Sequence, residues 1–173
     1  NTRKYHGLFV MPIEEFGGVN HILLSSVDET LIQHEKEFNL GIRSYGKIYE
    51  PRGHKYIVDF QFDKECTIEY RVGGMIFRKS MIFVKGKEQL LIKYTLVQAH
   101  SETYLRLKPF MAFREVHTLT QQNPEASANY GIVDNGASFK MYEGFPTLHL
   151  QLNKLEELKV HFSLFRGLLN HSE

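Results

Sequence analysis

Two adjacent glycines constrain the fold of this chain more than any other feature. Gly73-Gly74 separates residues 67–72 from residues 75–84, and both flanking segments are rich in apolar residues. A two-residue hairpin loop needs positive φ angles, which glycine adopts without steric cost. The sequence therefore predicts an antiparallel β-hairpin at this point.

Alternating apolar and polar residues predict strands along most of the chain. In residues 55–62, every second side chain from Tyr56 onward lies on one face. In residues 103–113, the apolar face begins at Leu105 and recurs at alternate positions. Further strands are predicted at residues 5–12, 20–27, 30–38, 89–98, 138–142, 147–152 and 160–165.

Turns and breakers divide these strands. Asp134-Asn135-Gly136 is a second turn signal, and glycines and prolines predict a loop over residues 39–53. Only residues 155–159 have a helical pattern, and this segment is too short to supply the connecting helices that βαβ units need. We therefore expect an all-β fold, an antiparallel sandwich or barrel, with residues 1–173 forming one domain.

Length and charge exclude several classes of function. The 173 residues include 21 basic and 20 acidic side chains, and a net charge of +1 does not indicate a nucleic acid or an anionic membrane as partner. No apolar run approaches the ~20 residues of a membrane helix. The single cysteine, Cys66, excludes an internal disulfide and fits a reducing compartment, so we expect a cytoplasmic protein.

The acidic residues do not form a catalytic pair. Glu14-Glu15, Asp28-Glu29 and Glu156-Glu157 are sequence neighbours, and neighbours on a strand point to opposite faces. Such a pair cannot flank one glycosidic bond as the two carboxylates of a glycosidase do. All three pairs are predicted to be solvated charge, and no residue is predicted to be catalytic.

The sequence also predicts neither a metal nor a cofactor. The nine histidines are scattered without the spacing of a metal-binding motif, and Cys66 has no second cysteine near it. No glycine-rich loop precedes a helix, and no Gly-x-Ser-x-Gly motif is present. Cys66 is predicted to be inert because it has neither a helix N-terminus nor a paired histidine beside it.

Two polar clusters remain, residues 1–6 and residues 113–120. They combine Arg, His and Tyr, with Glu115 in the second cluster. A sugar-binding cleft uses such side chains as directional donors, acceptors and ring faces. The same residue types also serve at a polar seam between domains, and composition alone leaves both interpretations open. The absence of Trp disfavours a stand-alone carbohydrate-binding module.

These clusters resemble a known family. The run Asn-Thr-Arg-Lys-Tyr-His-Gly-Leu at residues 1–8 is similar to the signature that opens the N-terminal domain of bacterial and archaeal glycogen debranching enzymes, the amylo-α-1,6-glucosidase family. Residues 114–119 resemble the second signature, with Val116 where an aromatic residue is usual. Residues 145–148 and 166–168 resemble its closing segments, whereas residues 169–173 depart from it.

The resemblance implies a large antiparallel β-sandwich of the kind that precedes glucoamylase-like catalytic domains. In such enzymes the hydrolytic groups belong to a following (α/α)6 barrel. The chain is therefore expected to be a non-catalytic fragment of a longer glycoside hydrolase, with α-glucan and the catalytic domain as its partners. By the same resemblance, the residues expected to bind substrate or face the barrel are Arg3, Tyr5, His6, Arg114 and His117.

Two other functions stay open from the sequence: an independent carbohydrate-binding module, and a structural or interaction sandwich with no sugar role. A shared cleft requires residues 3–6 and residues 114–117 to lie near each other. If the chain docks on a catalytic barrel, we also expect an exposed apolar patch where that barrel sits.

Overall fold

The computed structural model describes residues 5–45, 48–119, 123 and 125–153. Within these ranges the chain forms strands β1 to β13 and two short 3-10 helices. Antiparallel pairing joins β1 to β2, β2 to β3, β4 to β5, the strands from β6 to β9 in order, and the strands from β11 to β13 in order. The all-β fold class is therefore confirmed. The chain divides into two compact units, Asn1–Ser25 with Met111–Glu173 and Ser26–Phe110, and its expected organisation as one sandwich domain stays a prediction.

The first unit contains β1 (Phe9–Ile13), the 3-10 helix η2 (Glu14–Phe16) and the start of β2 (Val19–Gln33). It also contains the end of β10 (Tyr104–Glu115) and the three-stranded sheet of β11 (Tyr130–Val133), β12 (Gly136–Phe139) and β13 (Leu148–Gln151). The predicted turn between β11 and β12 is confirmed, because Val133 pairs with Gly136 and Asn135 has a positive φ of 52°.

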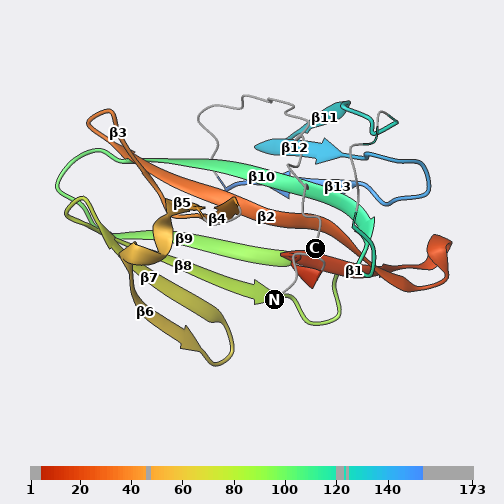
Figure 1. The fold of residues 1–173 in the computed structure, drawn as a ribbon, viewed down its shortest axis with the longest axis horizontal. Helices are drawn as coiled ribbons and strands as arrows, with labels where there is room; N and C mark the ends of the chain where they lie inside the picture. The colour runs from red at the N-terminus through yellow and green to blue at the C-terminus, as the bar shows by residue number, and fades with distance from the viewer. Residues whose placement is uncertain (1–4, 46–47, 120–122, 124, 154–173) are drawn as a thin grey trace. The chain divides into compact units, whose positions relative to one another are not determined.

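The second unit holds the remainder of β2 and β10. Its other elements are β3 (Lys36–Asn39), β4 (Ile42–Tyr45), β5 (Ile48–Arg52), the 3-10 helix η3 (Gly53–Tyr56), β6 (Ile57–Phe62), β7 (Cys66–Val72), β8 (Met75–Phe83) and β9 (Leu90–Gln98). Strands β6 to β9 form one sheet in sequence order, drawn from yellow to green in Figure 1.

The hairpin predicted around Gly73-Gly74 is confirmed. Val72 pairs with Met75, and the two glycines have φ angles of 57° and 78°. The side chains flanking the turn on one face of β7 and β8 belong to the core of the second unit. That core consists of Leu31, Leu40, Tyr70, Val72, Met75 and Phe77.

Four predicted boundaries in the N-terminal third were wrong. The first strand begins at Phe9 and not at residue 5. The break predicted between residues 27 and 30 is absent, because β2 runs without interruption from Val19 to Gln33. The strand predicted at residues 30–38 is instead divided by a turn at His34 and Glu35, with φ angles of 48° and 63°, which leads into β3. Neither residue is one of the glycine, asparagine, aspartate or proline residues that mark turns in a sequence, so no turn signal indicated the position. The predicted loop at residues 39–53 contains the β4–β5 hairpin.

The predicted face of β6 was wrong at one position. A register shift lies between Ile57 and Asp59, so Ile57 pairs with Tyr70 while Asp59 pairs with Glu69. The extra residue, Val58, is the reason that strict alternation fails there. Residues 155–159 and 160–165, predicted as a helical turn and a strand, lie outside the described residues.

The prediction that Asp28 and Glu29 are solvated was also wrong. Asp28 accepts two hydrogen bonds from the Arg43 guanidinium, at 2.8 and 3.1 Å. Glu29 is buried, and its Oε1 accepts hydrogen bonds from Lys79 Nζ at 2.6 Å and from the Tyr94 hydroxyl at 2.8 Å. Burial is tolerated here because both donors meet the carboxylate directly. Glu14 and Glu15 are exposed as predicted.

The buried carboxylate affects the tyrosines around it. Burial, and then the negative charge of Glu29, raises the pKa of Tyr94 far above its ordinary value. The same two causes raise the pKa of Tyr70 to about 12. Both phenols therefore stay protonated throughout the physiological range.

In the described part of the chain, no helix is long and apolar enough to cross a membrane.

Candidate functional site

The first polar cluster lies just before β1. Arg3 lies outside the described residues. Tyr5 and His6 are both exposed, and Tyr5 retains 54% of its accessible surface. Gly7 follows them at a point of close packing, since a Cβ there would lie 2.7 Å from a methyl group of Val10. A side chain at this position would therefore displace its neighbours, which explains why glycine interrupts the strand predicted here.

The second cluster begins at a strained position at the end of β10. Phe113 is buried and has a positive φ of 45°, a conformation that a bulky side chain rarely adopts. Its ring packs against Phe145 with 5.6 Å between centroids. The packing holds the backbone in a conformation that costs of order 1–2 kcal/mol. Arg114 and Glu115 complete β10, and the turn that follows at residues 116–118 carries His117.

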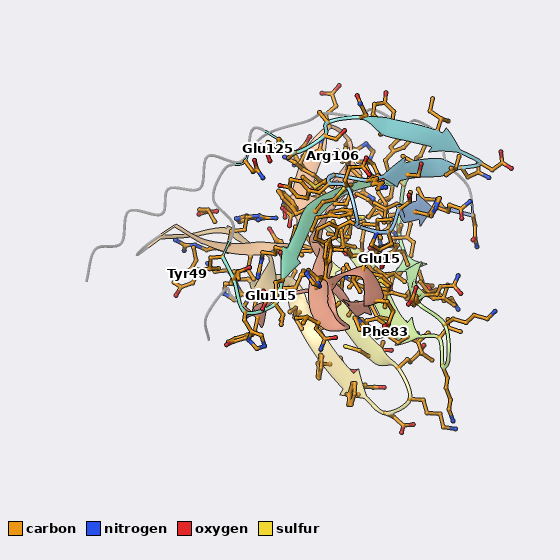
Figure 2. All side chains as sticks on the ribbon, turned by 90° about the vertical axis from the view of Figure 1, so that its right-hand side faces the viewer. Glu15, Tyr49, Phe83, Arg106, Glu115 and Glu125 are labelled. Atoms are coloured by element: carbon orange, nitrogen blue, oxygen red, sulfur yellow. The ribbon has the colours of Figure 1, made fainter. Side chains whose placement is uncertain are left out.

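Arg114 organises this turn. Its Nη1 donates hydrogen bonds to the carbonyl oxygens of Glu115 at 3.2 Å and Thr118 at 2.6 Å. The side chain is buried, and this burial lowers the pKa of Arg114 from its ordinary value. The backbone of Val116 also donates to Asn20 O at 3.0 Å, which ties the turn to the start of β2. Arg114 therefore acts here as a positioning group for the turn after Glu115, the end of β10 labelled in Figure 2.

The structure brings one residue from each polar cluster into contact. The rings of Tyr5 and His117 meet edge to face, with centroids 5.7 Å apart and planes at 78°. Both side chains are exposed. The expected proximity of the two clusters is thus found for this pair, which joins positions more than a hundred residues apart in the sequence. The binding role predicted for Arg3, Tyr5, His6, Arg114 and His117 stays a prediction.

An aromatic cluster lies beneath the turn, in the same unit. Phe145, from the third segment that resembles the family, lies 4.8 Å from Phe16, 5.4 Å from His21 and 5.9 Å from Tyr142, measured between ring centroids. His21 is buried, and a 2.7 Å hydrogen bond from its Nδ1 to the carbonyl oxygen of Val19, two residues earlier, orients its ring. No pattern in the sequence indicated this cluster, because its members come from separate loops and strands without a common period.

The exposed side chains of this arrangement can make polar contacts and ring contacts. Tyr5 offers a ring and a hydroxyl, and His117 offers ring nitrogens that donate or accept hydrogen bonds. Arg114 and Phe145 hold the turn on which His117 lies. In the described part of the chain, no three metal-ligating side chains gather into a group that could hold an ion.

A comparison with protein-family models decides the family. Residues 1–168 match the family described as the glycogen debranching enzyme N-terminal domain. The chain belongs to this family. The predicted family is confirmed, and the matched residues include all four segments that carried the resemblance. No significant match to this debranching-enzyme N-terminal domain was found among curated proteins or among solved structures.

Proposed function

We propose that this debranching-enzyme N-terminal domain is a non-catalytic part of a glycoside hydrolase of the amylo-α-1,6-glucosidase type. It helps to bind α-glucan and docks the catalytic domain of the same polypeptide. A cytoplasmic location belongs to this proposal, since Cys66 has no other cysteine in the chain to form a disulfide with. The observation that carries the proposal is the contact between Tyr5 and His117.

The binding part of the proposal follows from pre-organisation. Tyr5 and His117 are exposed, but the turn that carries His117 is held by Arg114 and by the Val116–Asn20 hydrogen bond. A ligand that meets an ordered turn loses less free energy to the ordering of the protein. The ring of Tyr5 and the nitrogens of His117 match the apolar faces and hydroxyl groups of a glucose unit.

The docking part of the proposal is supported by an exposed apolar face on the β6–β9 sheet. The register places Phe60, Phe62 and Phe83 on the face that also carries the core residues Tyr70 and Phe77. Their side chains remain 60%, 77% and 57% exposed. Since a phenylalanine buries roughly 150–250 Å² when covered, these three expose roughly 290–490 Å². That is as large as the biggest apolar patch of a typical monomer and indicates an interaction surface; Phe83 is labelled in Figure 2.

An NMR titration of the chain with maltooligosaccharides and an α-1,6-branched dextrin tests the binding part. We expect amide shifts at residues 5, 6 and 114–117, and we expect Tyr5→Ala and His117→Ala to abolish these shifts. Tyr49→Ala is the matched control, because Tyr49 is also exposed, at 51%, and lies in the other unit. Unchanged shifts in both site variants contradict the binding role.

The parent enzyme provides a second test. Arg3→Ala and His117→Ala in the full-length polypeptide are expected to slow glucose release from branched dextrin. Phe62→Ser and Phe83→Ser are expected to weaken association of the separately expressed catalytic domain with this chain. Association at unchanged affinity would remove the docking part while leaving the glucan-binding part intact.

A further inference from the structure

The β6–β9 sheet carries an organised polar surface on the face opposite its core residues. Two continuous rows of side chains cross all four strands there. The first row runs through Gln61, Thr67, Ser80 and Lys93, and the second through Asp59, Glu69, Arg78 and Thr95. We call these eight residues, together with Glu65 in the β6–β7 turn, the polar groove. All nine residues lie in the second unit.

The shape of the polar groove follows from the sizes of its side chains. The three hydroxyl residues Thr67, Ser80 and Thr95 are short, whereas the charged and amide residues around them are long. Strands lie ~4.8 Å apart and alternate residues ~6.8 Å apart, so the two rows span about 14 by 7 Å. The centre is therefore hollow, with a volume of about 390 Å³, and Ser80 on its floor is only 8% exposed.

Internal contacts hold the polar groove in place. Arg78 donates to Glu69 Oε2 at 2.8 and 3.2 Å, and Gln61 Nε2 donates to Asp59 Oδ2 at 2.8 Å. The hydroxyls of Thr67 and Ser80 lie 3.0 Å apart. None of the described contacts uses the Thr95 hydroxyl or the Lys93 ammonium group, so both remain available to a ligand.

The charge balance of the polar groove points to an uncharged ligand. Three carboxylates, from Asp59, Glu65 and Glu69, face two cations, from Arg78 and Lys93. A phosphate would meet the carboxylates and a cation would meet Arg78 and Lys93, so neither gains a field of one sign. A polyhydroxylated molecule, in contrast, both donates and accepts hydrogen bonds and can pair with the hydroxyl, amide and charged groups together.

We propose that the polar groove is a second, low-affinity binding site for the hydroxyl face of an α-glucan chain. The choice of an α-glucan as the ligand rests on the proposed function, whereas the location of the site rests on the groove alone. The groove lacks an aromatic platform among its lining residues. Binding therefore comes from hydrogen bonds that replace those to water, each with a modest net gain. The site fits a role in holding a long substrate, where several weak contacts act together.

The test is an NMR titration of the chain with maltoheptaose, compared for Thr95→Val, Lys93→Gln and Lys87→Gln. Thr95→Val keeps the branched shape and removes only the hydroxyl. Lys87→Gln is the matched control, because Lys87 lies in the exposed β8–β9 turn outside the groove. We expect amide shifts on β7, β8 and β9, and an affinity about fivefold weaker in each groove variant, as for the loss of one hydrogen bond. Lys87→Gln is expected to bind as the wild type does.

The outcomes separate this site from the one at Tyr5 and His117. Shifts confined to residues 5, 6 and 114–117, with unchanged affinity in the Thr95→Val and Lys93→Gln variants, overturn the groove and leave the proposed function standing. Groove shifts that persist in Tyr5→Ala and His117→Ala, while the shifts at residues 5, 6 and 114–117 are lost, support the groove as a site independent of the first. An absence of shifts anywhere, at millimolar maltoheptaose, overturns glucan binding by both sites.

Discussion

Removing the ammonium group of Lys79 is expected to destabilise the second unit strongly. Lys79 and Glu29 are both buried, and Nζ lies 2.6 Å from Oε1. Lys79→Met leaves a buried carboxylate without its counter-charge, a change that typically costs 3–5 kcal/mol. The Tyr94 hydroxyl still donates to the same Oε1 at 2.8 Å, so we expect the lower end of that range, about 3 kcal/mol. A domain of ordinary stability loses a large fraction of its free energy of unfolding through such a change.

The assay is urea unfolding followed by circular dichroism, with the midpoint compared between variants. Arg78→Met is the matched control. Arg78 is the preceding residue on the same strand, but its ion pair with Glu69 is on the outer face and partly exposed, so its loss is expected to cost at most about 1 kcal/mol.

A double variant makes the reasoning refutable. Glu29→Leu with Lys79→Met removes both charges and leaves only the Tyr94 hydroxyl without its acceptor, a cost of about 1–3 kcal/mol. We therefore expect the double variant to be no less stable than Lys79→Met alone. Equal midpoints for Lys79→Met and Arg78→Met, or fully additive losses in the double variant, would show that the buried pair does not act as a unit.

Three further predictions concern the fold. Burial raises the pKa of Tyr70 to about 12, so the neutral phenol is favoured in the folded state. The stabilisation from this group is therefore expected to be complete below about pH 10 and to be lost as the pH rises to about 12. Urea unfolding across that pH range measures the loss. Gly73→Ala is expected to lower the midpoint of thermal unfolding more than Gly86→Ala does. Both glycines have positive φ, but a Cβ at Gly73 lies 2.8 Å from the Phe38 ring, whereas Gly86 has open space around it. Equal losses of stability in the two variants would contradict the steric argument. Phe113→Ala is expected to destabilise by about 3 kcal/mol, since it empties a fully buried site, and the midpoint of chemical unfolding checks this; a loss below about 1 kcal/mol would mean that relief of the strained φ offsets the cavity.

Features that depend on a few consecutive residues were predictable. The β7–β8 hairpin follows from Gly73-Gly74, and the β11–β12 turn follows from the Asp-Asn-Gly run, because turn conformations are selected by the residues that occupy them. The exposed and half-buried sides of β10 followed the alternation beginning at Leu105. The family was also recognisable from short segments, and the match over residues 1–168 confirms it.

Features that depend on distant partners were not predictable. Glu29 was expected to be exposed to solvent, because no residue near it in the sequence indicates a buried partner. Lys79, fifty residues away, supplies that partner and makes its burial possible. The turn at His34 and Glu35 carries no glycine, since the pairing of β2 with β3 imposes it. The Phe145 cluster likewise joins residues from both ends of the chain.

The sequence by itself determined the all-β class, the strongest turns, the family and the residue types of the candidate site. Only the tertiary structure decided that Tyr5 meets His117, that Arg114 supports the turn beneath it, and that nine polar residues line one hollow on the β6–β9 sheet. The physical reason is that local conformation depends on neighbouring residues. A binding surface depends on strand register, which brings distant side chains together only when the whole sheet has formed.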